Sequence, residues 1–242
     1  MDLPAAALFA ALDATWPAAS RSTCGPFTLR DGQGGGKRVS AATLDGPGSF
    51  VTGDIGAAEA GMERLGQRPL FMIRAGEEAL DHALAARGYA LADPVVAMAG
   101  PADAVAGAGP EYMSAFPIWP RLRICDDIWA ACGVGPERLA VMDRVKGPKT
   151  AILSRRSERA AGAAFVALSG RVAMVHALAV LPALRRRASA VNMVRCAAKW
   201  AQDNGARSLV ALVREDNAAA RALLASMNMK NVGYYHYRLK TV

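Results

Sequence analysis

The chain has 242 residues, of which 52% are hydrophobic and 21% are charged, so it can fill the core of one large or two small domains and is not a disordered protein. No apolar run approaches the roughly 18 residues of a membrane-spanning helix. The N-terminal segment carries Asp2 and Asp13 instead of the cationic start of a signal peptide, so we expect a soluble, cytoplasmic protein with no membrane partner.

The excess positive charge is confined to the second half of the chain. Residues 1–110 hold 8 Lys and Arg against 12 Asp and Glu, a net charge of −4, whereas residues 111–242 hold 21 against 9, a net charge of +12. This asymmetry predicts an anionic ligand or substrate on the second half. Nucleic acid, a phosphate-bearing cofactor and an acidic protein all fit the charge alone.

Cysteine and histidine spacing argues against a metal site. The four cysteines show no CxxC spacing, and three histidines are too few for a cluster that is local in sequence. We expect buried free thiols and no bound metal.

The first half contains fewer clear elements than the second. Residues 27–30 and 38–44 flank the sequence DGQGGGK as a predicted hairpin, and residues 55–65 have the pattern of a helix. Residues 100–110 are rich in Gly, Ala and Pro without apolar periodicity, which is typical of a linker. The expected domains are therefore 1–105 and 111–242.

The second half predicts the element order β-β-β-α-β-α-β, an α/β fold with a mixed sheet and helical cover. The helix at 217–227 is opened by Asp216 and Asn217. The strands are expected at 150–155, 163–168, 171–180, 208–213 and 232–240, and the other helix at 188–204.

The two halves share an internal similarity at an offset of 140 residues. The sequence PLFMIRAGEEALDHALAARGY (69–89) matches LVALVREDNAAARALLASMNM (209–229) without gaps, with Arg74 over Arg214 and Leu84 over Leu224. The match predicts two copies of one fold. Any two β-α units look alike at this level, so chance similarity remains the alternative.

The stretch LPALRRRASAVNMVR (181–195) sets three arginines between an apolar strand and a helix. A strand that turns into a helix directs unpaired backbone N–H groups and the positive helix end to one point, and small residues there allow an anion to approach. We expect a phosphate site formed by Arg185, Arg186, Arg187, Ala188, Ser189 and Ala190. A solvated, charged helix start is the alternative.

These residues resemble the acyl-CoA-binding motif of the GNAT superfamily of N-acetyltransferases, through Val180-x-Pro182-x-x-Arg185-x-x-Ala188-x-Ala190. The resemblance implies acetyl-CoA as co-substrate, with its diphosphate at Arg185–Ala190. It further implies that main-chain atoms of Leu178 and Val180 pair with pantetheine, and that Asn217 and Ala220 hold the pantetheine side. Asn217 as a plain helix cap remains open.

The first half resembles the degenerate N-terminal unit of tandem GNAT proteins, through Trp16-Pro17, GPFTLR and GGGKRVSAAT, and the closing GYYHYRL is similar to the last strand of that group. Residues 45–54 (DGPGSFVTGD) lack the phosphate-loop spacing and are acidic, so phosphate would be repelled there. We expect one cofactor site per chain, in the second half.

Departures from the family pattern leave the catalytic groups unassigned. Ala188 replaces the usual glycine, Leu223-Leu224 replaces a Leu-Tyr pair, Asn228-Met229 replaces Gly-Phe, and Met174 stands where some members carry a glutamate base. The remaining candidates are His176 as a base, on the same strand face as Met174, Leu178 and Val180, and Tyr234, Tyr235 or Tyr237 as an acid. Packing roles for all four are the alternative.

The sequence thus predicts an acyl-CoA-dependent N-acetyltransferase that acts on a small-molecule or peptide amine. A catalytically silent acyl-CoA-binding or sensing protein is the alternative. A nucleic-acid-binding module is not expected, because basic and aromatic residues are not interleaved. A homodimer is compatible with the sequence, which carries no signal for the oligomeric state.

Overall fold

The computed structural model describes residues 3–46 and 49–241. They form two compact units, each assembled from separate stretches of chain. Unit 1 comprises the described part of Met1–Pro17 together with Ala97–Val213 and Asn217–Val232. Unit 2 comprises Ala18–Val96, Arg214–Asp216 and Gly233–Val242 in its described part. The expected domains 1–105 and 111–242 are continuous in sequence, whereas these units are not.

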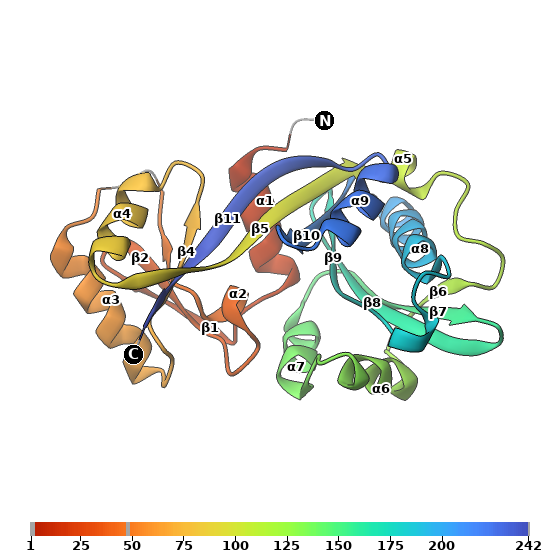
Figure 1. Ribbon diagram of the computed structural model, residues 1–242, viewed down its shortest axis with the longest axis horizontal. Helices are drawn as coiled ribbons and strands as arrows, with labels where there is room; N and C mark the ends of the chain where they lie inside the picture. The colour runs from red at the N-terminus through yellow and green to blue at the C-terminus, as the bar shows by residue number, and fades with distance from the viewer. Residues whose placement is uncertain (1–2, 47–48, 242) are drawn as a thin grey trace. The chain divides into compact units, whose positions relative to one another are not determined.

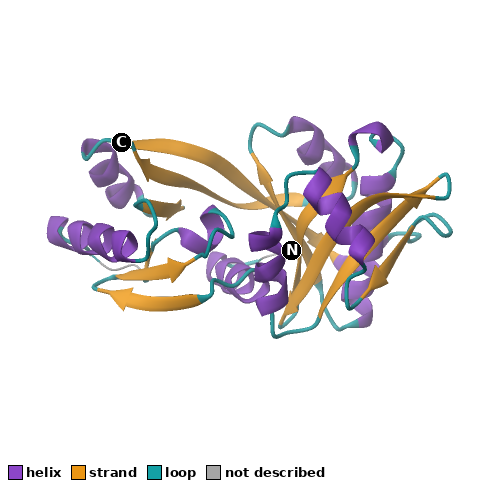
Figure 2. Ribbon diagram, turned by 90° about the horizontal axis from the view of Figure 1, so that it is seen from below, coloured by secondary structure: helices purple, strands orange, loops and turns teal. Residues whose placement is uncertain are grey.

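Unit 1 is a mixed α/β unit in which the strand order is β10-β9-β8-β7-β6. Helix α8 lies on one side of this sheet, and α6 and α7 lie on the other (Figures 1 and 2). Its elements are α1 (Ala5–Thr15), α5 (Ala102–Ala106), β6 (Ala115–Ile118), α6 (Arg123–Ala131), α7 (Pro136–Arg144), β7 (Lys149–Arg156), β8 (Arg159–Ser169), β9 (Val172–Val180), the 3-10 helix η1 (Pro182–Leu184), α8 (Ser189–Asp203), β10 (Ser208–Arg214) and α9 (Ala218–Ser226).

Unit 2 contains a three-stranded sheet of order β1-β2-β3 and an antiparallel pair of β4 and β11. Its core gathers Phe27, Ile55, Met62, Phe71 and Leu84, all fully buried. Its elements are β1 (Ser20–Cys24), β2 (Phe27–Asp31), α2 (Lys37–Ser40), β3 (Thr43–Leu44), α3 (Thr52–Arg64), β4 (Leu70–Arg74) and α4 (Glu78–Ala86); β5 (Tyr89–Pro101) and β11 (Lys230–Lys240) contribute residues to both units.

The predicted elements of the second half are confirmed in kind and order. Strands β7, β8 and β9 pair antiparallel, because apolar runs joined by short polar turns fold back on one another. Strand β10 then pairs parallel with β9 after the crossover through α8. The internal similarity also has a structural counterpart, since the bounds of α4 and α9 differ by 140 residues at both ends.

Two expectations are wrong in detail. Residues 37–40 form helix α2, and only Thr43–Leu44 of the expected strand is extended. The predicted hairpin is confirmed in its strand pair, since β2 pairs antiparallel with β3 (Phe27 with Leu44 and Thr28 with Thr43), but the connection between them contains α2 as well as DGQGGGK. A second, shorter hairpin joins β1 to β2 across Gly25, where φ is +56°. The expected linker contains the end of β5 and helix α5, in which Ala102, Val105 and Ala106 are buried.

None of the helices in the described part of the chain combines the length and apolar character that crossing a bilayer requires. Over the same residues, His, Cys, Asp and Glu form no group of three that is placed to bind a metal ion. All four cysteines are free; Cys125 and Cys196 are buried, and Cys24 and Cys132 are half-buried.

Candidate functional site

Strands β9 and β10 separate part-way along their length. They pair in parallel only from Val172 with Ser208 to Val175 with Ala211. Strand β9 continues to Val180 and β10 to Arg214 without further pairing between them. Where β9 no longer pairs with β10, its edge carries main-chain donors and acceptors, which can pair with an extended ligand.

Val180 at the end of β9 has main-chain groups on the side of this opening. Leu181 N–H donates to Ala161 O on β8 (2.9 Å), so strand alternation directs the N–H and C=O of Val180 away from β8, whereas Leu178 lies where the pairing with β8 is irregular. Leu178 is 39% exposed, which is unusual for a leucine in a sheet interior. The opening therefore has an apolar side chain available for a ligand to cover.

A bulge at Ala177 shapes the opening. Its φ is +47°, a left-handed conformation that costs an L-residue roughly 1–2 kcal/mol, and its carbonyl accepts a hydrogen bond from Trp129 Nε1 (2.8 Å) on α6. The bulge interrupts strict alternation. His176 therefore does not share one face with Leu178 and Val180 as predicted, since His176 is buried and Leu178 is exposed.

The turn between β9 and α8 is a cluster of unpaired backbone N–H groups. Arg186 and Ala188 both have φ of +62°, and Ala188 is the N-cap residue of α8. Within the described residues, the six N–H groups of 186–191 donate to no protein acceptor; the first paired N–H of the helix is that of Asn192, which donates to Ala188 O. Alternating left-handed residues at a helix start form a concave anion-binding nest.

Cationic side chains surround this nest and remain accessible. Arg185, Arg186 and Arg187 are all exposed, and Arg185 Nε donates to Val180 O (3.2 Å), which fixes its guanidinium beside the end of β9. Ala188 and Ala190 are half-buried, while Ser189 is buried with its hydroxyl directed inward. Ser189 can therefore offer its N–H to an anion, but not its side chain.

Asn217 caps helix α9. Its Oδ1 accepts a hydrogen bond from Ala220 N (3.1 Å), and the side chain is exposed. The capping alternative is thus confirmed, and the role of these two residues beside pantetheine stays a prediction.

His176 is buried in an aromatic cluster of unit 1. It is 2% exposed, its ring centroid lies 4.9 Å from that of Trp16, and its Nε2 lies 2.9 Å from Thr15 Oγ1. Thr15 Oγ1 donates to Ala11 O (2.7 Å), so Nε2 of His176 must supply the proton between them. This is the environment of a hydrogen-bonded core histidine.

The three candidate tyrosines differ sharply in exposure. Tyr235 and Tyr237 are 1% and 3% exposed, and burial raises the pKa of both. Tyr234 lies on the other face of β11 and is 36% exposed; burial, then Glu215 and Asp81, raises the pKa of its hydroxyl. Of the three, only Tyr234 reaches solvent.

A charged cluster of Asp81, His236 and Arg238 lies beside Tyr234 and was not predicted. Asp81 of α4 accepts hydrogen bonds from Arg238 Nε (2.7 Å) and His236 Nε2 (2.7 Å), and the His236 and Tyr234 rings lie 5.9 Å apart. Arg238, and after it His236, lowers the pKa of Asp81 to about 2. An alternation of polar residues in GYYHYRL was the available signal, but its partner on α4 is distant in sequence.

In unit 2 the corresponding junction is closed by a side chain. Strands β3 and β4 meet in parallel at Ala42 and Phe71, and beyond this bridge Arg74 donates from Nη2 to Leu44 O. Glu77 holds the same guanidinium through Nε (2.7 Å). Arg74 thus fills the space between these strands, whereas its counterpart Arg214 is 59% exposed and pairs with Asp216.

The strand separation and the nest lie within a segment that matches a known family. The family model described as "Acetyltransferase (GNAT) family" matches residues 123–229. Residues 123–229 are a GNAT domain. The GNAT domain includes β7 to β10 and helices α6 to α9, and therefore the whole opening and nest.

Solved structures extend the likeness in fold beyond the GNAT domain. A GCN5-related N-acetyltransferase from Kribbella flavida has a TM-score of 0.72 at 13% identity, covering 100% of this chain and 97% of its own. A functionally unknown conserved protein from Staphylococcus epidermidis has a TM-score of 0.68 at 9% identity, covering 94% and 96%. A tandem GNAT protein from the clavulanic acid biosynthesis pathway has a TM-score of 0.57 at 13% identity, covering 82% and 74%.

These comparisons show that unit 2 as well as the GNAT domain has a GNAT-like fold, as the sequence resemblance implied. No curated protein matches the sequence.

Proposed function

We propose that the protein transfers an acetyl group from acetyl-CoA to the amine of a small molecule or peptide. The observation that carries this proposal is the nest of six unpaired N–H groups at 186–191, placed where β9 and β10 have separated. Acetyl-CoA supplies a thioester, a pantetheine chain with amide groups, and a diphosphate.

The residues present fit such a co-substrate. Arg185 and the N–H groups of Arg186–Ala190 would hold the diphosphate, because both direct positive charge to one exposed point. Main-chain groups of Leu178 and Val180 would pair with the pantetheine amides, in the manner of an added strand. Asn217 and Ala220 would border the pantetheine from α9.

One such site per chain is expected. In unit 2, Arg74 and Glu77 fill the corresponding space between β3 and β4, and Asp45 and Asp54 place negative charge in the loop that would have to receive phosphate. The Asp54 carboxylate already accepts a hydrogen bond from Val51 N (2.8 Å) and Asp45 accepts one from Thr28 (2.7 Å).

The chemistry needs a group that receives the ammonium proton and one that protonates the departing thiolate. Among the tyrosine candidates, Tyr234 is the proposed donor because it is 36% exposed, whereas Tyr235 and Tyr237 are 1% and 3% exposed. His176 is 2% exposed and donates from Nε2 to Thr15, so its ring is enclosed in the aromatic cluster of unit 1. We assign it to the core.

A catalytically silent acyl-CoA-binding or sensing protein is the second candidate. It is favoured by Leu224 and Met174, which are 4% and 0% exposed and therefore offer no titratable group at the two family positions. Acetyl-CoA affinity, thioester hydrolysis and transfer to a broad panel of amines separate the two. Binding with transfer supports the enzyme, binding without transfer supports the sensor, and absence of binding defeats both.

A further inference from the structure

A continuous path of contacts links the nest to the hairpin between β7 and β8. Val180 pairs with Gly162, near the start of β8, and Arg156 pairs with Arg159 across the hairpin. On the other side, Asn192 in the first turns of α8 accepts a hydrogen bond from Glu111 N (3.1 Å). Because Glu111 is also bound by Arg156 (2.6 Å), these segments form one end of unit 1.

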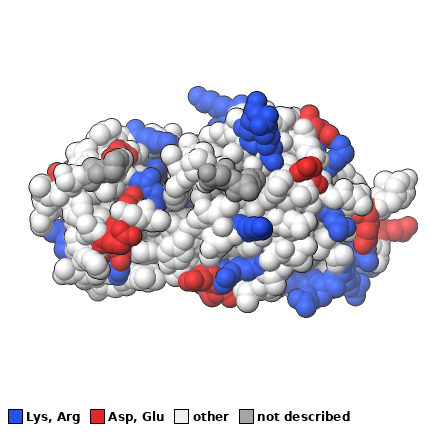
Figure 3. Space-filling model, turned by 90° about the horizontal axis from the view of Figure 1, so that it is seen from above, with Lys and Arg blue, Asp and Glu red and all other residues white. Residues whose placement is uncertain are grey.

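Six arginines lie at this end, and we call them the arginine rim: Arg155, Arg156, Arg159, Arg185, Arg186 and Arg187. All are at least partly exposed. Within the described residues, only Arg156 has a carboxylate partner, namely Glu111. Arg155 contacts Glu158 through the carbonyl oxygen (3.4 Å) and Arg185 contacts the Val180 carbonyl. Figure 3 shows that lysine and arginine side chains gather into patches on the molecular surface.

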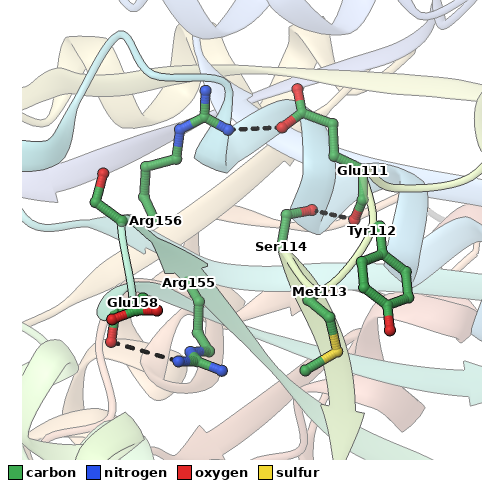
Figure 4. A pocket seen from close by; sticks show the side chains of 8 residues that line it. Glu111, Tyr112, Met113, Ser114, Arg155, Arg156 and Glu158 are labelled. Carbon is green, nitrogen blue, oxygen red and sulfur yellow. Dashed lines mark hydrogen bonds and ion pairs between the residues drawn. The ribbon is translucent and has the colours of Figure 1, made fainter.

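The hairpin side of the rim borders a groove of about 330 Å³. In Figure 4, Arg156 and Glu111 pair at one end of this groove, and Arg155 and Met113 extend toward the other. Tyr112 and Met113 are 95% and 55% exposed. Exposed Tyr, Met and Arg side chains around a groove are the residue types enriched in protein interfaces.

The hairpin arginines are not needed for the diphosphate. In the strand order β10-β9-β8-β7-β6, the opening lies between β9 and β10, whereas Arg155, Arg156 and Arg159 lie on the other side of β9. A partner that covers both the hairpin and the nest must be acidic over a broad area and must also bring a phosphate group.

We propose that this end of unit 1 docks an acidic carrier protein whose phosphopantetheine arm carries the acetyl thioester. This proposal rests on the proposed function and widens its donor class from acetyl-CoA to a protein-bound thioester. Such an arm is joined to its protein through one phosphate, which fits the nest, while the acidic protein surface contacts the arginine rim. Charge complementarity over the rim steers the encounter.

The transfer step balances without a further reactant. The substrate ammonium first gives one proton to a base, and the neutral amine then attacks the thioester carbonyl, so that the C–N bond forms and the C–S bond breaks. The nitrogen loses a second proton as the amide forms, and this loss balances the one proton that the departing carrier thiolate takes to become a thiol. The products are an amide and the free carrier thiol.

The test uses a bacterial fatty-acid acyl carrier protein in its apo, holo and acetylated forms, titrated into the full chain by calorimetry. The variant is the double charge reversal Arg155→Glu and Arg159→Glu. The matched control is Arg171→Glu, an exposed arginine in the turn before β9, at the opposite end of that strand from Val180.

We expect the holo carrier to bind, to compete with CoA, and to bind more tightly than the apo form. The double reversal should lower the affinity for the holo carrier roughly tenfold or more. It should leave the acetyl-CoA affinity within about twofold of the parent value, because the residues of the nest are unchanged. Arg171→Glu should change neither affinity. Raising the salt concentration should lower the affinity for the carrier more than the affinity for acetyl-CoA.

Acetyl-CoA binding without carrier binding would overturn this inference and leave the proposed function standing. Equal losses of carrier and acetyl-CoA affinity in the double reversal would also overturn it. If single-stranded RNA binds through the same arginines and the carrier does not, the rim is a nucleic-acid surface and the inference is wrong. Failure of acetyl-CoA itself to bind would defeat the proposed function first.

Discussion

Ala188 is the residue at which the nest can be altered with the least change elsewhere. It adopts φ of +62° and ψ of 1° at the N-cap of α8, where its methyl group stands beside the unpaired N–H groups. The left-handed conformation costs an L-residue roughly 1–2 kcal/mol. Glycine removes that cost, but it also lowers stability by roughly 0.5–1 kcal/mol because it loses more backbone entropy on folding. Ala188→Gly should therefore stabilise the fold by about 0.5–1 kcal/mol.

The same change should also strengthen binding, because the methyl no longer limits how closely a phosphate approaches the backbone. Ala188→Val should act in the opposite direction, since a β-branched residue at positive φ is strained and crowds the nest. We expect acetyl-CoA affinity to fall in the order Gly, Ala, Val, with valine about tenfold or more weaker than alanine. Calorimetry gives the affinities, and urea denaturation gives the free energies of unfolding.

Ala190→Gly is the matched control. Ala190 is the second residue of α8 and its φ is not positive, so glycine there relieves no strain and should lower stability by up to about 0.5–1 kcal/mol. The reasoning is refuted if both glycine variants lose stability alike, or if Ala188→Val binds acetyl-CoA as tightly as the parent chain.

Three further predictions concern the residues around the site. Thr15→Val removes the hydroxyl that accepts from His176 Nε2 and should lower the free energy of unfolding, measured in urea, by about 1–3 kcal/mol, with acetyl-CoA affinity unchanged. An unaltered free energy of unfolding would show that this hydrogen bond does not stabilise the fold. Asp81→Asn should lower the free energy of unfolding by about 2 kcal/mol at pH 7. Because the folded pKa of Asp81 is depressed to about 2, its stabilisation is present above pH 3.8 and is lost as the pH falls toward 2; a stability difference from the Asn variant that persists at pH 2 would contradict this. Tyr234→Phe should reduce turnover about 100-fold, whereas Tyr235→Phe and Tyr237→Phe should retain it, and full activity of the Tyr234 variant would remove the proposed donor.

The second half was predictable because its local and tertiary preferences agree. Apolar runs, short polar turns and the Arg185 motif lie on successive elements of one sheet, so periodicity alone gave β7 to β10 and α8. The offset of 140 residues likewise followed from strand and helix patterns that recur in β4 with α4 and in β10 with α9.

The prediction of a linker at 100–110 was wrong because small residues are found in closely packed segments as well as in flexible ones. Gly100 lies so close to Val105 and to the Asn228 carbonyl that an added Cβ would meet these atoms at 2.8 and 2.9 Å. Absence of periodicity there reflected tight packing of β5 and α5, which a sequence pattern does not separate from a flexible segment.

The parts of the site that depend on distant partners could not be read from the sequence. The Ala177 bulge depends on the Trp129 indole, 48 residues away, and the closure at Arg74 depends on the Leu44 carbonyl. Strand alternation therefore misplaced His176 relative to Leu178. The different exposures of Tyr234 and Tyr235 follow from what packs on each face of β11 in unit 2.

The central claim is that the turn at 185–190 binds the diphosphate of coenzyme A, and titration calorimetry with acetyl-CoA tests it most directly. We predict one bound molecule per chain, with affinity that falls when Arg185 is replaced by alanine. No detectable binding at millimolar acetyl-CoA, or two equivalent sites per chain, would contradict it.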